Sequence, residues 1–388
     1  MPRSVKSILL FPVDLTFSTA NDIVAGDTNC AFGALALDAV TTANGNNAFG
    51  YQALTSNTTG NLNQAFGYSA LEMNTTGSAN DAFGHKALEE NTTGSNNCAF
   101  GGGTLDDNTT GSNNAGFGMG ALGANTTASN NTAVGYQALL LNTTGTYNTA
   151  VGYEAGYSNS TSAQNTFVGY RAGKGSNASD VTYIGFDSGL HATGGSNTCL
   201  GHRTMDASSC TGGNNTALGR ECLGGLTTAS NNVAVGYLAG HDLTTGYDNI
   251  AIGSEALSTS TTGYRNVAIG YHALKVQQNN IENTAVGTEA GYQVTTAGYN
   301  VLLGRRAGGN LTTGGFNVML GTYANPAAAG NEGSIVIGYA STGKGTNTGF
   351  ISPNGGAVYQ GSNSSTWSTT SDIRIKKNVI DNITGLDK

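Results

Sequence analysis

The chain has 388 residues, of which 59 are glycine and 10% are charged, whereas ordinary globular chains carry roughly 25% charged residues and about 7% glycine. Its net charge of −8, with no basic cluster except a short group near the end, argues against a nucleic-acid groove. No apolar run reaches the ~20 residues that span a bilayer, so we expect neither nucleic acid as a partner nor membrane insertion.

Residues 1–28 precede the first repeat. Two basic residues stand before a short apolar stretch at 8–11, but Pro12 and Asp14 end that stretch below the length of a signal-peptide core. We interpret residues 1–28 as an N-terminal cap or attachment segment.

From 29 to 344 the sequence repeats every 17 residues when it is aligned on the glycine of Ala-Phe-Gly or Ala-Val-Gly. The only other spacings, two of 16 and one of 18, fall between Gly169 and Gly219. A 17-residue repeat is shorter than β-α units, which need roughly 20 residues or more, and suits two short strands and two turns. The predicted fold class is all-β: a parallel β-solenoid, or β-roll, of about nineteen coils.

Asparagine stands four residues before the repeat glycine in 17 of the 19 coils. Stacked amides can hydrogen-bond along a solenoid, so we interpret this column as a structural ladder and not as a catalytic feature. Members of the expected ladder are Asn46, Asn63, Asn80 and Asn131.

The residue just before the glycine is large and apolar in every coil. Phenylalanine fills the first six coils, including Phe49, Phe66 and Phe83, and aliphatic residues follow from Val134 onward. Stacked at one strand spacing per coil, this column predicts a continuous apolar spine.

Small residues, usually alanine, stand two residues before and three residues after the glycine. They predict a closely packed surface, which is either the far wall of a flat coil or the contact with a neighbouring chain. Because symmetric self-association is the default for oligomers, we expect the alanine face to be the contact between chains.

The other half of many coils carries Asn-Thr-Thr-Gly, which predicts a turn. Five cysteines form no C-x-x-C pair and are interpreted as free thiols in packed coils. The histidines lack zinc-site spacing, so we expect no metal and no cofactor. The irregular coils at 181–219 are expected to bulge, to hold Cys210 in a loop and to offer a surface for interaction.

The segment 131–138, N-T-A-V-G-Y-Q-A, resembles the head repeat of trimeric autotransporter adhesins. With its N-T-T-G turns, the repeat is also similar to the shafts of phage tail fibres, although the coil is longer than in the adhesins. The resemblance covers residues 29 to about 341. It implies a left-handed parallel β-roll that assembles as a homotrimer.

Beyond the repeat, residues 345–370 read as a Gly/Asn/Ser-rich fibre end. Residues 371–388 open with S-D-I-R-I-K-K-N, which resembles the start of the intramolecular chaperone domain of phage tail spikes and fibres. That family drives trimerisation and then cuts itself off through a Ser-Lys dyad. The resemblance implies that Ser371 is the nucleophile and Lys376 the base, with cleavage before Ser371. Since the sequence stops at Lys388, we expect the start of a truncated domain without activity of its own.

These observations predict a structural, adhesive shaft of a phage tail fibre that carries host-receptor binding and matures by autocleavage of a C-terminal chaperone. Apart from that single-turnover cleavage, the chain is not expected to be an enzyme. The expected partners are two further copies of the chain and a host surface receptor, either a glycan or an outer-surface protein. The expected location is the virion tail fibre, outside the cell. The alternatives are a trimeric adhesin head on a bacterial cell surface, or a solenoid that binds ice or polysaccharide.

Overall fold

The structure is a computed structural model that describes residues 28–353, 357–361, 366 and 368–369. These residues form two compact units, divided between Ser162 and Ala163, and each unit is described by itself. Every regular element within the described residues is a β-strand, as predicted for the all-β class.

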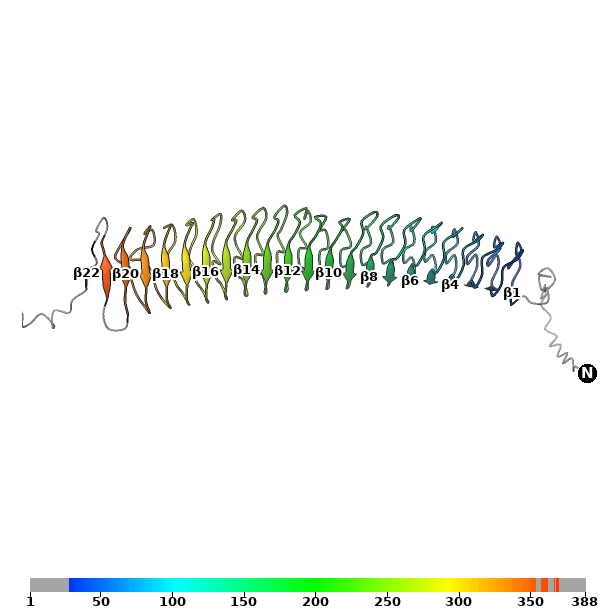
Figure 1. The fold of residues 1–388 in the computed structure, drawn as a ribbon, viewed down its shortest axis with the longest axis horizontal. Helices are drawn as coiled ribbons and strands as arrows, with labels where there is room; N and C mark the ends of the chain where they lie inside the picture. Colours follow the sequence, from blue (N-terminus) through cyan, green and yellow to red (C-terminus); the bar gives the residue numbers. More distant parts are fainter. Residues whose placement is uncertain (1–27, 354–356, 362–365, 367, 370–388) are drawn as a thin grey trace, which may run out of the picture. The chain divides into compact units, whose positions relative to one another are not determined.

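Unit 1 contributes one three-residue strand per coil to a parallel stack, shown in blue to green in Figure 1. Neighbouring strands pair in register, so that Ala48 lies beside Ala65 and Phe49 beside Phe66, 17 residues further along. The parallel solenoid with 17-residue coils is therefore confirmed, but each coil has one strand and not the two short strands that its length suggested. The strands are β1 (Cys30–Phe32), β2 (Asn47–Phe49), β3 (Gln64–Phe66), β4 (Asp81–Phe83), β5 (Cys98–Phe100), β6 (Ala115–Phe117), β7 (Thr132–Val134) and β8 (Thr149–Val151).

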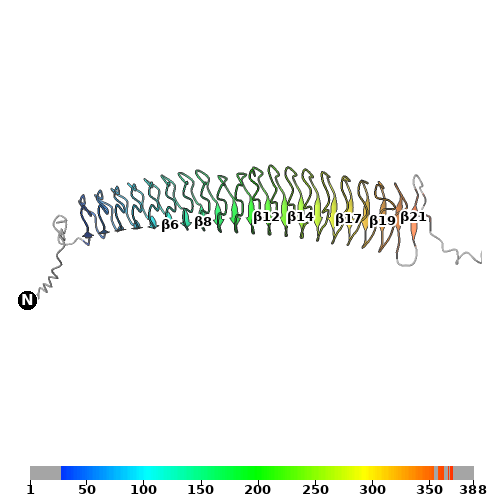
Figure 2. The same cartoon turned by 180° about the vertical axis from the view of Figure 1, so that it is seen from behind.

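Unit 2 has the same coil architecture (Figure 2) but ends differently. Strands β9 to β20 pair in parallel, whereas β21 and then β22 add to the sheet antiparallel. The strands are β9 (Thr166–Val168), β10 (Thr182–Ile184), β11 (Thr198–Leu200), β12 (Thr216–Leu218), β13 (Val233–Val235), β14 (Ile250–Ile252), β15 (Val267–Ile269), β16 (Thr284–Val286), β17 (Val301–Leu303), β18 (Val318–Leu320), β19 (Ile335–Ile337), β20 (Gly349–Ile351), β21 (Val358–Gln360) and β22 (Ser368–Thr369).

The residue after each of the strands β1 to β19 is the glycine on which the repeat was aligned, here called the coil glycine. Gly50 has a φ of +145°, a conformation that other residues rarely adopt. A Cβ on Gly50 would also lie only 2.1 Å from the carbonyl oxygen of Gly67 in the next coil. The backbones of successive coils therefore touch at this corner, and the coil requires glycine there.

The interior of each coil is narrow and is filled mainly by small side chains. In the second coil the middle strand residue, Ala48, packs inward together with Ala53 and Leu54 from the following turn, and all three are fully buried. The alanine columns are thus the facing walls of one coil. The prediction that they form the contact between chains is wrong, because their side chains are already covered by their own coil.

Two ladders of buried asparagines run through unit 1. In the ladder four residues before the coil glycine, the Asn63 backbone N–H donates to Asn46 Oδ1 at 2.9 Å, and Asn63 Nδ2 donates to the carbonyl oxygen of Gly77 at 2.9 Å. The second ladder starts the Asn-Thr-Thr-Gly turns. There Asn74 Nδ2 donates to Asn57 Oδ1 at 2.9 Å and also to the Gly77 carbonyl at 3.0 Å. The two ladders therefore meet at one turn carbonyl, which satisfies both buried amides.

Unit 2 keeps the first ladder but replaces much of the second by apolar packing. Seven residues after the coil glycine, where unit 1 has asparagine, three coils have Leu243, Val294 and Leu311. Each of these coils has glycine in place of leucine three residues earlier. A Cβ on Gly240, for example, would come within 3.0 Å of Leu243 Cδ1. The large side chain has moved from one position of the coil to another, and the core stays filled.

The irregular coils keep the strand register instead of bulging. Tyr183 lies beside Cys199, and Cys199 beside Ala217, although these steps are 16 and 18 residues long. Cys210 is fully buried and forms a parallel bridge with Ala192. The prediction of a surface loop around Cys210 is therefore wrong, because the extra residues are taken up in the turn while the strand is retained.

Candidate functional site

The candidate site is the outward side of the strands. A three-residue strand alternates, so its middle residue points inward while its first and third residues point outward. We call the first and third residues of β1 to β19 the strand face, and we consider it separately in each unit.

In unit 2 the strand face becomes wholly aliphatic over β13 to β15 and again over β17 to β19. Both outward residues of β14 are isoleucines: Ile250 is 37% exposed and Ile252 is 36% exposed. A contiguous row of such pairs is a larger apolar surface than soluble monomers usually leave uncovered. The outward aliphatic residues of these strands are Val233, Val235, Ile250, Ile252, Val267, Ile269, Val301, Leu303, Val318, Leu320, Ile335 and Ile337.

In unit 1 the strand face carries a stack of phenylalanine rings. The ring centroids of Phe49 and Phe66 are 4.8 Å apart, and those of Phe66 and Phe83 are 4.7 Å apart, with interplanar angles of 6° and 5°. The stack continues through Phe100 to Phe117, which are 37% and 40% exposed. The predicted apolar spine therefore exists as a single file, and it lies outside the coil.

The structure places the ladder residues named from the sequence in two different environments. Asn46, Asn63, Asn80 and Asn131 are fully buried and hydrogen-bonded along unit 1. Phe49, Phe66, Phe83 and Val134 lie on the strand face, and Val134 is 38% exposed. The asparagines hold each coil to the next, whereas the phenylalanines and Val134 are available for contact with another molecule.

Ser371 and Lys376 lie outside the described residues. The proposed self-cleavage dyad therefore stays a prediction, as do the interpretations of residues 1–28 and 371–388.

Aromatic rings also border the strand face, at the position after the coil glycine. Tyr51 stacks on Tyr68 with centroids 5.3 Å apart, and Tyr68 stacks on His85 at 5.4 Å. Tyr51 and Tyr68 are nearly half exposed, a position that suits a ring with a polar hydroxyl at its tip.

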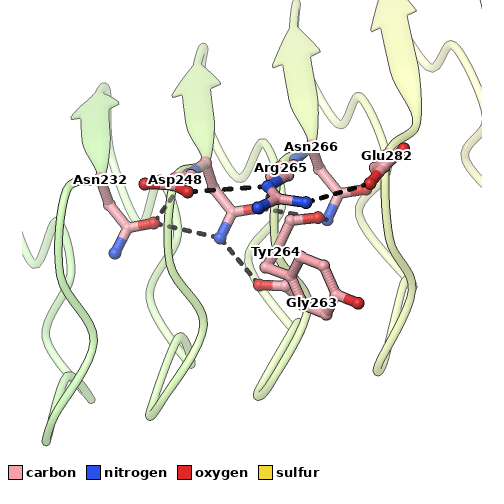
Figure 3. Close-up of polar contacts among 8 residues, drawn as sticks. Asn232, Asp248, Gly263, Tyr264, Arg265, Asn266 and Glu282 are labelled. Carbon is pink, nitrogen blue, oxygen red and sulfur yellow. Dashed lines mark hydrogen bonds and ion pairs between the residues drawn. The ribbon is translucent and has the colours of Figure 1, made fainter.

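Charged side chains form ladders away from the strand face. Figure 3 shows Arg265 between two acidic residues of neighbouring coils, 3.8 Å from Asp248 and 3.3 Å from Glu282. Beneath these exposed pairs runs the buried ladder, in which Asn266 Nδ2 donates to Asn249 Oδ1 at 3.1 Å. Exposed ion pairs of this kind contribute at most about 1 kcal/mol each, so they set surface charge more than stability.

Metal-ligating side chains are not clustered in the described part of the chain. No cluster of three His, Cys, Asp or Glu side chains there could hold a metal ion. Burial raises the pKa of the Cys210 and Cys222 thiols to about 12, which keeps both protonated and unreactive. Among the described residues there is also no helix long and apolar enough to cross a membrane.

The threonines of the Asn-Thr-Thr-Gly turns do not form a doubled hydroxyl row. The first threonine of each pair uses its hydroxyl within the fold: Thr58 Oγ1 donates to the Thr75 carbonyl at 3.0 Å, and Thr75 Oγ1 donates to the Thr92 carbonyl at 2.9 Å. Only the second threonine, such as Thr76, is exposed. A flat two-column threonine surface, which would favour ice binding, is therefore not formed by these turns.

Comparison with known proteins adds no relative: no protein-family model, no curated protein and no solved structure gives a significant match to this chain.

Proposed function

We propose that this chain is the shaft of a phage tail fibre and that three copies assemble with their strand faces turned toward one another. The observation that carries the proposal is the outward apolar column of both units, stacked phenylalanines in unit 1 and paired aliphatic residues in unit 2. Burying this surface in a homotrimer would remove a long row of apolar side chains from water.

Self-association suits this surface because the coils repeat in register. A row of identical outward side chains can meet the same row of another copy along its length, and each contact is repeated coil after coil. The resemblance to trimeric adhesins and fibre shafts supplies the chain count of three and the left-handed winding.

The proposed role is mechanical and adhesive. Ladders of hydrogen-bonded asparagine and in-register strands resist local opening, since each coil is held by the coils on both sides. Such a shaft would hold a receptor-binding surface away from the virion, outside the cell. An adhesin head on a bacterial surface would use the same trimer and differs in what anchors it.

Maturation is proposed to occur at the C-terminal tail. In a chain extended by the complete chaperone domain, Lys376 would take the proton of the Ser371 hydroxyl while Ser371 Oγ attacks the carbonyl carbon of Thr370. The Thr370–Ser371 amide bond would then break as its nitrogen accepts that proton, and water would hydrolyse the resulting ester and separate the two pieces. Replacing Ser371→Ala in that extended chain should abolish the cleaved product on a denaturing gel, whereas Ser368→Ala should leave it. Cleavage that persists in S371A would remove Ser371 from this role.

The assembly is tested by the mass of the native particle. The wild-type protein should sediment as three chains of 39.2 kDa. Ile269→Asp places a carboxylate on the strand face and should release monomers, because three buried charges would face one another. Thr245→Asp, at an exposed turn position of the same unit, is the matched control and should remain trimeric. A wild-type monomer would contradict the proposal.

A further inference from the structure

Unit 2 contains a surface hollow of about 510 Å³ beside the turns that follow β15 to β18. This volume falls within the roughly 300–1,000 Å³ of small-molecule sites. Its lining includes His272, Glu289, Tyr292, Arg306, Asn310 and Tyr323. None of these residues belongs to the strand face, so association through that face uses other side chains.

The hollow exists because one side chain of a column is missing. The position five residues after the coil glycine holds Lys275 and then Tyr292 in successive coils, but the next coil has Gly309. Gly309 does not have a positive φ, so its backbone does not require glycine. Next to Gly309, the hollow is lined by Asn310 and by Asn325 of the following coil.

Two pairs of opposite charges lie at or beside the hollow. Arg306 forms an ion pair with Glu289, and Lys275 forms one with Glu255. The hydrogen bond from Arg306 lowers the pKa of Glu289, so both partners stay charged at neutral pH. An ionic ligand would have to separate such a pair, and the hollow is therefore better suited to an uncharged ligand.

The other side chains at the hollow are aromatic rings, amides and the guanidinium of Arg305. The Tyr292 ring lies 5.8 Å from His272 in a tilted arrangement, and the Arg305 guanidinium lies 5.4 Å from the centre of the Tyr323 ring. Asn325 Oδ1 accepts a hydrogen bond from the Asn310 backbone N–H at 3.2 Å. Among the described residues, neither the Gln293 amide nor the Tyr292 hydroxyl has a hydrogen-bond partner. The site thus offers ring faces together with neutral donors and acceptors.

We propose that this hollow binds a neutral oligosaccharide. A sugar ring presents an apolar face of C–H groups and a rim of hydroxyls, which matches ring faces bordered by amides and a phenol. The inference rests on the proposed function for its biological meaning, since it assigns the host-surface ligand to the coils of β15 to β18.

The test uses saturation-transfer NMR and titration of the full chain with neutral oligosaccharides of glucose, galactose, mannose and N-acetylglucosamine. Wild-type protein should bind at least one of them. Tyr292→Ala should weaken that binding roughly tenfold through loss of a ring contact. Gly309→Leu should abolish binding, because the new side chain fills the hollow while that column accepts side chains in other coils.

Matched controls exist for both changes. Tyr157 ends the same Glu-Ala-Gly-Tyr quartet in unit 1, and Gly224 occupies the position of Gly309 in the coil of β12. Tyr157→Ala and Gly224→Leu should bind like wild type. Three results would overturn the proposal. The first is an equal loss of sugar affinity in a control and in its matched variant. The others are binding only of an acidic oligosaccharide, such as a galacturonate oligomer, and no binding of any neutral oligosaccharide.

Failure of this site and failure of the proposed function give different results. If a trimer adsorbs to host cells equally well with and without G309L, and no neutral sugar binds, the shaft proposal stands and the hollow is excluded. If the protein is a monomer that binds a neutral sugar in a manner dependent on Tyr292, the hollow stands and the trimeric shaft is wrong.

Discussion

Unit 1 and unit 2 build the same coil with different interior chemistry. In unit 1 the turn is held by a second ladder of buried asparagines, in which Asn91 Nδ2 donates to Asn74 Oδ1 at 2.7 Å. In unit 2 several turns are held by an aliphatic side chain, such as Leu243 opposite Gly240. The strand faces also differ, with stacked rings in one unit and aliphatic pairs in the other.

The comparison separates what the coil requires from what it tolerates. Both units keep the coil glycine and the first asparagine ladder, which connect backbone to backbone between coils. The second ladder is replaceable wherever leucine and glycine exchange places within the coil. A fully hydrogen-bonded asparagine and a leucine can thus each fill this position of the coil interior. A buried asparagine that lacks some of its hydrogen bonds would instead destabilise the coil.

The largest effect is expected at the coil glycines of both units. Gly67→Ala would place a Cβ 2.2 Å from the Gly84 carbonyl oxygen, and Gly236→Ala would place one 2.7 Å from that of Gly253. Each should destabilise the chain by roughly 3 kcal/mol or more, with the greater loss in unit 1. Urea unfolding followed by circular dichroism measures this. Wild-type stability in either variant would mean that the coils do not touch at this corner.

The next largest effect is expected when an asparagine of the second ladder is replaced by leucine. Asn91→Leu removes an amide that hydrogen-bonds Asn74 and the Gly94 carbonyl, and it should cost about 3 kcal/mol in unit 1. Adding Leu88→Gly reproduces the unit 2 pairing and also relieves a φ of +54° at residue 88. The double variant should regain roughly 1 kcal/mol. A double variant that is less stable than N91L alone would show that the two interiors are not interchangeable.

The smallest effect is a pH dependence that belongs to unit 1. Partial burial, and then the negative charge of Glu89, raise the pKa of Asp106 to about 6. The folded state therefore keeps this proton up to about pH 6, whereas the unfolded chain loses it near its ordinary value, so stability falls as pH rises between the two. Asp106→Asn should remove this dependence and stabilise the chain at pH 7 by roughly 1 kcal/mol, because the carboxyl is still partly solvated.

Thermal unfolding at pH 4 and pH 7 measures the dependence on Asp106. In unit 2, Lys275 occupies the equivalent position, and its hydrogen bond lowers the pKa of Glu255 instead. Glu255→Gln should accordingly not stabilise the chain at pH 7. A D106N variant with the same pH profile as the wild type would contradict the assignment.

Much of the coil could be predicted from spacing, because the glycines that mark the repeat also end the strands. The outward position of Phe49 and the inward position of Ala48 were not predicted, although period-2 alternation and a narrow interior favour the smaller residue inside. The prediction of a surface loop around Cys210 was wrong because the sequence alone does not show whether a change in coil length alters a turn or interrupts a strand. The hollow near Gly309 could not be predicted, since it depends on side chains from four coils.

Hydroxyl-radical footprinting of the native particle tests most directly whether other copies cover the strand face. In the single chain Phe100 and Phe117 are 37% and 40% exposed, while Phe316, away from the strand face, is 64% exposed. If three copies pack face to face, Phe100 and Phe117 should be almost unreactive while Phe316 is oxidised at its full rate. Oxidation of Phe100 in proportion to its single-chain exposure would contradict the assembly.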